Sequence, residues 1–121
     1  MSEIRLETTI IKNLVKNEEF CRKVLPFLKD EYFTESDERT VFTEIKSYFE
    51  EYVKPPTPEA LLINLENNTS LTDNVLKASK YVVDGISKLT DDTPSEWLVN
   101  ETEKWCKDRA MYIAVMDSIE V

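Results

Sequence analysis

The chain has 121 residues, enough for one domain with its own hydrophobic core. Hydrophobic residues make up 41% and charged residues 32%, which is typical of a globular protein and excludes a disordered chain. The formal net charge is −9, which disfavours tight binding to a phosphate backbone because that binding comes mostly from Lys and Arg.

The first predicted helix runs from Glu3 to about Lys16, because aliphatic residues recur along it near helical spacing. These residues are Ile4, Ile10, Ile11, Leu14 and Val15. Asn17 is predicted to cap a second, shorter helix, which Pro26 interrupts. The apolar side of this second segment is formed by Phe20, Val24 and Leu25.

The clearest interior helix is predicted to begin with a cap at Thr34 or Ser36 and to run to about Tyr52. Its apolar side is formed by Val41, Phe42, Ile45, Tyr48, Phe49 and Tyr52. Charged residues fill the other face, which we expect to be solvated: Glu38, Arg39, Glu44, Lys46, Glu50 and Glu51. The prolines at 55 and 56 stop this helix.

Two further helices are predicted before residue 90. Thr57 followed by Pro58 is a helix start, and that short helix ends at the pair of asparagines at 67 and 68. Thr72 or Asp73 opens the next helix, whose predicted buried side is formed by Val75, Leu76, Val82, Val83, Ile86 and Leu89. Gly85 lies inside this helix. Either the glycine allows a close crossing with another helix, or it has no special structural role.

The polar segment from Thr90 to Pro94 is predicted to separate a helical domain, residues 1–92, from a last helix, residues 95–121. Four residues of this last helix recur at strict seven-residue spacing: Leu98, Trp105, Tyr112 and Ile119. Thr102, Arg109 and Met116 interleave with them. A seven-residue repeat favours packing along a partner helix.

The predicted fold is all-α, a compact bundle of about five to six helices. Gly85 is the only glycine, and so few hairpins or tight turns can form. No glycine, asparagine or proline stops the last helix before Val121. We therefore expect this helix to be truncated and the chain to be a piece of a longer protein.

The composition also excludes most catalytic chemistry. A single glycine cannot build a phosphate-binding loop, and the absence of histidine removes the commonest general base and metal ligand. We therefore predict no catalytic, cofactor-binding or metal site in this chain. Cys21 and Cys106 are expected to be reduced, partly buried thiols. No apolar run approaches a membrane span, and we expect no membrane partner.

The aromatic residues of the last helix are the strongest candidates for a protein interface. Trp97, Trp105 and Tyr112 have no obvious packing partner in the sequence pattern, and interface centres are enriched in Trp, Tyr and Arg. Packing back on the bundle is the alternative. Arg109 lies within the apolar stripe, where it either pairs with a partner's carboxylate or extends to solvent. The predicted interface residues are Trp97, Leu98, Thr102, Trp105, Arg109, Tyr112, Met116 and Ile119.

An ordered set of segments resembles the N-terminal domain of the DnaB-like hexameric replicative helicases, in particular their T-even phage branch. The most specific segment is SEWLVNETEKWCKDRAMYIA, from Ser95 to Ala114. Two earlier blocks carry the rest of the likeness, Asp30-Glu31-Tyr32-Phe33 with the following helix, and Ala60-Leu61 with Leu65-Glu66-Asn67. The likeness covers essentially the whole chain, but none of these blocks is a catalytic motif.

The resemblance implies that the whole protein is an ATP-dependent DNA helicase, with a motor that binds ATP and Mg²⁺ and moves 5′ to 3′ on single-stranded DNA. In the family, N-terminal domains pair through helical hairpins, and three pairs form a collar above the motor ring, where primase docks. The resemblance implies that residues 95–121 are the truncated first helix of such a hairpin. The chain itself would lack the motor and reach single-stranded DNA only through the full ring. Its implied location is the cytoplasm of an infected bacterial host.

Two alternatives stay open at this point. The chain could be a complete small acidic helical adaptor without a helicase motor. It could also bind single-stranded DNA directly through exposed aromatic residues, since base stacking contributes about 1–3 kcal/mol per base. The net charge of −9 opposes the second alternative.

Overall fold

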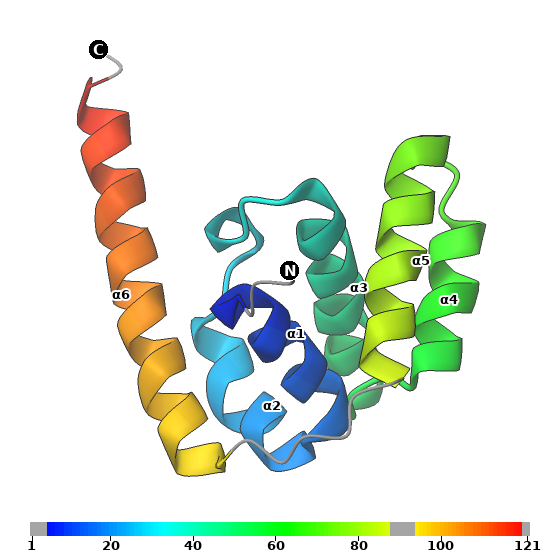
Figure 1. Cartoon of the computed structure of the whole chain (residues 1–121), viewed down its shortest axis with the longest axis horizontal. Coiled ribbons are helices and arrows are strands. Elements are labelled where there is room, and N and C mark those ends of the chain that lie inside the picture. The colour runs from blue at the N-terminus through cyan, green and yellow to red at the C-terminus, as the bar shows by residue number, and fades with distance from the viewer. Residues whose placement is uncertain (1–4, 88–93, 120–121) are drawn as a thin grey trace.

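A computed structural model describes residues 5–87 and 94–119, and it consists of helices joined by short turns (Figure 1). The helices are α1 (Leu6–Lys16), α2 (Glu18–Val24), α3 (Ser36–Tyr52), α4 (Pro58–Asn67), α5 (Asp73–Ser87) and α6 (Ser95–Ile119), with short 3₁₀ turns η1 (Leu25–Phe27) and η2 (Asp30–Tyr32). No strand occurs among these described residues, and the prediction of an all-α fold is confirmed.

The helices form a bundle around α1 and α3. In Figure 1, α4 and α5 run side by side and cover one side of α3, whereas α6 lies on the opposite side of the molecule, next to α2. The interior joins residues from every α-helix. Its largest fully buried side chains are Phe20, Phe33, Phe42, Ile10, Ile11, Leu14, Leu28, Ile45, Leu61, Leu65, Ile86 and Leu98.

Side-chain caps define the starts of three helices, as the sequence predicted. The Asn17 side chain accepts a hydrogen bond from the Phe20 amide at 3.1 Å and caps α2. Thr57 does the same for α4 through the Ala60 amide, also at 3.1 Å. Thr72 accepts from the Val75 amide at 3.3 Å at the start of α5. In each case a short polar side chain satisfies an amide that the first turn leaves free.

The start of α3 differs from the prediction. Neither Thr34 nor Ser36 caps this helix, because the capping position is Glu35, whose side chain makes no capping hydrogen bond. Asp37, in the first turn, accepts a hydrogen bond from the Glu38 amide at 2.8 Å instead. An acidic first turn is also favourable beside the positive end of the helix dipole.

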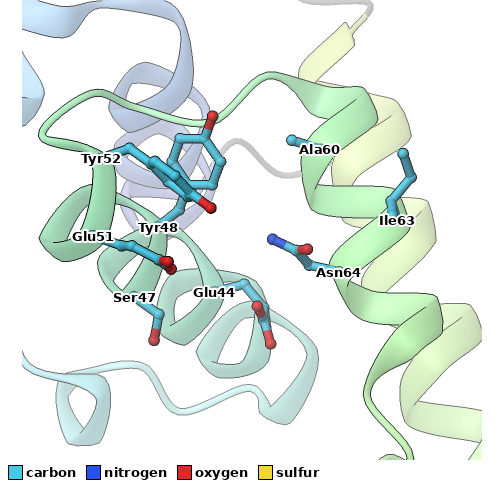
Figure 2. A pocket seen from close by; sticks show the side chains of 8 residues that line it. All are labelled: Glu44, Ser47, Tyr48, Glu51, Tyr52, Ala60, Ile63 and Asn64. Atoms are coloured by element: carbon cyan, nitrogen blue, oxygen red, sulfur yellow. The ribbon is translucent and has the colours of Figure 1, made fainter.

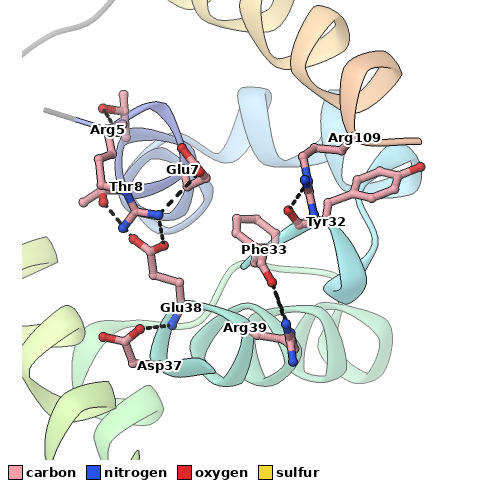
Figure 3. Close-up of polar contacts among 10 residues, drawn as sticks. Arg5, Glu7, Thr8, Tyr32, Phe33, Asp37, Glu38, Arg39 and Arg109 are labelled. Carbon is pink, nitrogen blue, oxygen red and sulfur yellow. Dashed lines mark hydrogen bonds and ion pairs between the residues drawn. The ribbon is translucent and has the colours of Figure 1, made fainter. Parts of the chain in front are cut away.

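Glu38 corrects a second expectation, because it is buried and not on a solvated face. Only 3% of the residue is exposed. Its carboxylate accepts a hydrogen bond from the Thr8 hydroxyl at 2.7 Å and pairs with the Arg5 guanidinium at 3.0 Å (Figure 3). The carboxylate thus ties the start of α3 to the start of α1. A buried charge is tolerated only with such partners.

The other end of α3 lies where the sequence placed it. The helix ends at Tyr52, and Val53 follows in the left-handed conformation with φ 57°. Arg22 of α2 donates a hydrogen bond to the Val53 carbonyl at 2.8 Å, and its guanidinium lies over the Phe49 ring, 5.4 Å from the centroid. This contact holds an uncommon backbone conformation and joins α2 to the end of α3.

The interpretation of Gly85 as a close helix crossing is wrong. A Cβ atom added at this position would meet no heavy atom within 4 Å. Leu89 and most of the predicted boundary, residues 90–93, lie outside the described residues. The division into two domains at this boundary stays a prediction.

Candidate assembly interface on α6

The first half of α6 packs against the bundle. Leu98, Thr102 and Cys106 are four residues apart, and their exposed fractions are 0%, 1% and 8%. They face α2, α1 and η2. At the start of α6, the Asn17 amide donates a hydrogen bond to the Ser95 hydroxyl at 2.8 Å. These contacts fix the direction in which α6 leaves the bundle.

Trp105 continues this attachment through aromatic contacts. Its ring meets Tyr32 edge-on, with centroids 6.1 Å apart and an angle of 89° between the planes. It also lies 5.1 Å from the Phe33 ring, which in turn packs on Phe42 of the core at 4.9 Å. Edge-to-face and tilted pairs are favourable arrangements for aromatic rings. The alternative of packing back on the bundle therefore applies to Trp105.

Arg109 marks the place where α6 leaves the bundle. Its Nε donates a hydrogen bond to the Tyr32 carbonyl at 2.9 Å, as Figure 3 shows. Its guanidinium also lies 5.1 Å from the centroid of the Tyr112 ring, a cation–π contact. Pairing of Arg109 with a partner's carboxylate stays a prediction, and the side chain does not extend freely to solvent. The side chain caps a backbone carbonyl and supports an aromatic ring.

The last turns of α6 carry an exposed apolar patch. We call the following five residues the α6 patch: Met111, Tyr112, Val115, Met116 and Ile119. Their exposed fractions lie between 40% and 70%. Figure 1 shows these turns standing clear of the other helices. At about 100° per residue, the five positions fall within an arc of about 140° on the helix, and Tyr112 and Met116 at its edge continue the stripe that faces the bundle.

The predicted seven-residue repeat runs from the core to solvent. Leu98 is fully buried, Trp105 is partly buried, and Tyr112 and Ile119 are 55% and 69% exposed. An α-helix drifts by about 20° per heptad relative to a strict seven-residue repeat. The stripe therefore turns away from the bundle as the helix also passes beyond it. The first two residues of the repeat, Leu98 and Trp105, thus pack within the chain, whereas the last two, Tyr112 and Ile119, are exposed.

The predicted interface residues divide accordingly. Leu98 and Thr102 are buried within the chain, and Trp105 and Arg109 contact the turn η2. The exposed members are Trp97, Tyr112, Met116 and Ile119. Sequence reasoning missed Met111 and Val115, which lie outside the heptad positions but beside them on the helix surface. A search with the 3.6-residue period over the last three turns would have found them.

The described residues hold no cluster of three or more His, Cys, Asp or Glu side chains that could bind a metal ion. Within the same residues, no helix has the length and apolar character to cross a membrane. Cys21 and Cys106 are both buried free thiols. The main surface feature of α6 within the described residues is thus the exposed α6 patch.

No protein-family model matches the chain. A protein described as a DnaB-like replicative helicase, from Enterobacteria phage T4, is 36% identical to it over 113 residues. The matched region covers 93% of this chain and 23% of the phage helicase, in that protein's N-terminal part. The comparison confirms the resemblance drawn from the sequence, and the chain spans less than a quarter of the length of this relative.

Proposed function

From its similarity to the N-terminal part of a DnaB-like replicative helicase, we propose that this chain is the N-terminal collar domain of such a helicase. In this role it organises the subunits of a hexameric ring and docks primase at a phage replication fork, in the cytoplasm of the bacterial host. ATP binding with Mg²⁺, hydrolysis and 5′ to 3′ movement on single-stranded DNA belong to a motor in the rest of the longer protein.

The α6 patch is the observation that carries the assembly part of this proposal. Five large apolar side chains at the end of one helix are exposed together, whereas the first half of the same helix is anchored in the core. Exposed apolar groups gathered in this way are typical of surfaces that contact another protein. A second copy of the chain, in dimers of which three form a ring, is the partner that the relationship favours.

The association test compares matched substitutions. We expect sedimentation velocity of a concentration series to show dimers of the unmodified chain, because pairing buries the α6 patch. The double variant Met111→Glu/Val115→Glu should weaken pairing at least tenfold, because it places charges in an apolar contact. The control is Tyr81→Glu, a residue on α5 that is 81% exposed and outside the α6 patch. It should pair like the unmodified chain.

A longer chain gives the decisive outcome. If a chain extended through the predicted second hairpin helix stays strictly monomeric at high concentration, pairing through α6 is wrong. Reading the gene beyond codon 121 tests the helicase assignment separately. A phosphate-binding loop motif downstream supports a helicase, whereas a stop codon would favour the small acidic adaptor. Tight binding to single-stranded DNA in a gel shift at low salt would favour direct DNA contact.

A further inference from the structure

A second surface feature lies away from α6, in the cleft between α3 and α4. The cleft has a volume of about 380 Å³ (Figure 2). Its α3 wall is formed by Glu44, Ser47, Tyr48, Glu51 and Tyr52, and its α4 wall by Ala60, Ile63 and Asn64. Each set recurs at helical spacing, and so two helix faces meet across the cleft.

Two tyrosine rings form the aromatic part of the α3 wall. Tyr48 and Tyr52 are one turn apart, and their ring centroids lie 4.6 Å from each other. Arg22 covers the Phe49 ring and Arg109 covers the Tyr112 ring. Among the described residues, no such cation lies over Tyr48 or Tyr52. Tyr52 is also 57% exposed, and so part of its ring can be reached by a cation from outside the chain.

The carboxylates of the cleft also lack a cation. Glu44 and Glu51 have no ion pair within the part of the chain that the structure describes, whereas Glu18, Glu38 and Glu66 each have one. Figure 2 shows Glu44 and Glu51 on the α3 wall, with Asn64 reaching from α4 toward them. Their negative charge, in a chain of net charge −9, repels anions and attracts cations.

An exposed apolar group completes the cleft. Ile63 is 58% exposed and Tyr52 is 57% exposed, although both lie on its walls. The cleft therefore offers aromatic faces, carboxylates and an aliphatic contact together. An arginine side chain matches all of these, because its planar guanidinium stacks on aromatic rings and pairs with carboxylates while its stem is aliphatic.

We propose that the α3–α4 cleft binds an arginine side chain from a basic segment of a partner protein. The guanidinium stacks on Tyr48 or Tyr52 and pairs with Glu44 or Glu51, and the stem of the arginine lies against Ile63. The argument rests on charge complementarity and on the exposed ring of Tyr52. It is independent of α6 and of the proposed helicase role.

The test uses a defined peptide, acetyl-Ala-Arg-Ala-amide, titrated into the ¹⁵N-labelled 121-residue chain and followed by NMR. We expect chemical shift changes concentrated in residues 44–52 and 60–64. The matched peptide with citrulline in place of arginine has nearly the same shape without the charge. It should bind at least fivefold more weakly. Equal binding of the two peptides would overturn the proposal.

Two variants separate the parts of the cleft. Glu44→Gln/Glu51→Gln should weaken binding of the arginine peptide at least fivefold, and Tyr52→Ala should weaken it without any change in charge. The control Asp84→Asn/Glu103→Gln removes the same charge from exposed positions on α5 and α6 and should leave binding unchanged.

Two results would contradict the assignment. If the control weakens binding as much as the cleft variant does, the peptide is attracted by the net charge of the chain and does not bind specifically in the cleft. If putrescine binds as tightly as the arginine peptide in the same residues, the cleft is a site for a small polyamine and not for a protein side chain. The dispersed NMR spectrum of each variant shows that it is folded.

Discussion

At the scale of single residues, Glu38 is a carboxylate buried between α1 and α3, where two side chains contact it. The Thr8 hydroxyl donates to one oxygen and the Arg5 guanidinium lies 3.0 Å from the other. We expect Glu38→Gln to lower the free energy of unfolding by about 1–3 kcal/mol, because a charge-assisted contact is lost inside the protein. Urea denaturation at neutral pH measures this change.

Glu7 provides the control for Glu38. It also pairs with Arg5, but at 3.4 Å and with a more exposed side chain. Exposed ion pairs contribute about 0–1 kcal/mol, and so Glu7→Gln should have the smaller effect. Equal effects of the two substitutions would mean that burial of Glu38 does not determine its contribution.

The two buried thiols make the free energy of unfolding depend on pH in the alkaline range. Burial raises the pKa of Cys21 and of Cys106 from 9.0 to about 11. Below pH 9 the thiols are mostly protonated in both the folded and the unfolded chain, and the free energy of unfolding keeps its full value. Between pH 9 and 11 the unfolded thiols ionise first, so stability falls as the pH rises, by up to about 2 kcal/mol per thiol.

The measurement compares urea denaturation at pH 8 and pH 10.5. The unmodified chain should lose more stability over this interval than the variant Cys21→Ala/Cys106→Ala, whatever their difference at pH 8. Other groups, such as lysines and tyrosines, titrate in both proteins and cancel in the comparison. Parallel losses in the two proteins would contradict a raised pKa of the thiols.

Substitution of Gly85 is predicted to increase the stability of the chain. It lies inside α5, and a methyl group added there meets open space. Alanine has the higher helix propensity by about 1 kcal/mol, and it also restricts the unfolded chain. Gly85→Ala should therefore raise the melting temperature, as measured by circular dichroism. A lower melting temperature would contradict the open space at this position and show that the added methyl group is unfavourable within the folded chain.

At the scale of elements, Asn17 joins three helices. It ends α1, caps α2 through the Phe20 amide and donates to Ser95 at the start of α6. Asn17→Ala should lower the unfolding free energy by more than Thr57→Ala, which removes a cap alone and costs about 1 kcal/mol. Asn17→Asp keeps the capping oxygen but removes the donor to Ser95. In urea denaturation it should lower the unfolding free energy by less than Asn17→Ala does.

The starts of α2, α4 and α5 and the end of α3 were predictable because their signals are local, whereas the predicted cap of α3 was wrong. Asn17, Thr57 and Thr72 act within three residues of their own positions, and the sequence prediction of each was confirmed. Glu38 was not predictable in this way. Its burial depends on Thr8 and Arg5, which lie some 30 residues away in the sequence, and periodicity within α3 carries no information about them.

The candidate interface was predictable in part for the same reason. The seven-residue repeat marked one side of α6, but it did not reveal that the bundle already covers the first half of that side. Burial of Leu98 depends on α1 and α2, which come far earlier in the chain. The exposed half, with Met111 and Val115 beside it, became evident only when the end of the bundle was located.

At the scale of the whole molecule, α6 both completes the core and extends beyond it, and two shortened chains separate these roles. A chain ending at Ala110 keeps Leu98, Thr102 and Cys106 in place and loses the α6 patch together with Ile113, which is partly buried against the core. In urea denaturation its free energy of unfolding should fall by no more than about 1.5 kcal/mol, because Ile113 is only partly buried and the side chains of the α6 patch are exposed.

A chain ending at Pro94 removes all of α6 and should lose more than about 3 kcal/mol, because deleting even one fully buried leucine typically costs 2–5 kcal/mol. The chain ending at Ala110 should also be monomeric in sedimentation velocity, since its α6 patch is gone. If that chain is stable and still pairs, another surface mediates association. If it unfolds like the chain ending at Pro94, the last turns of α6 support the core directly, and their exposed side chains are structural.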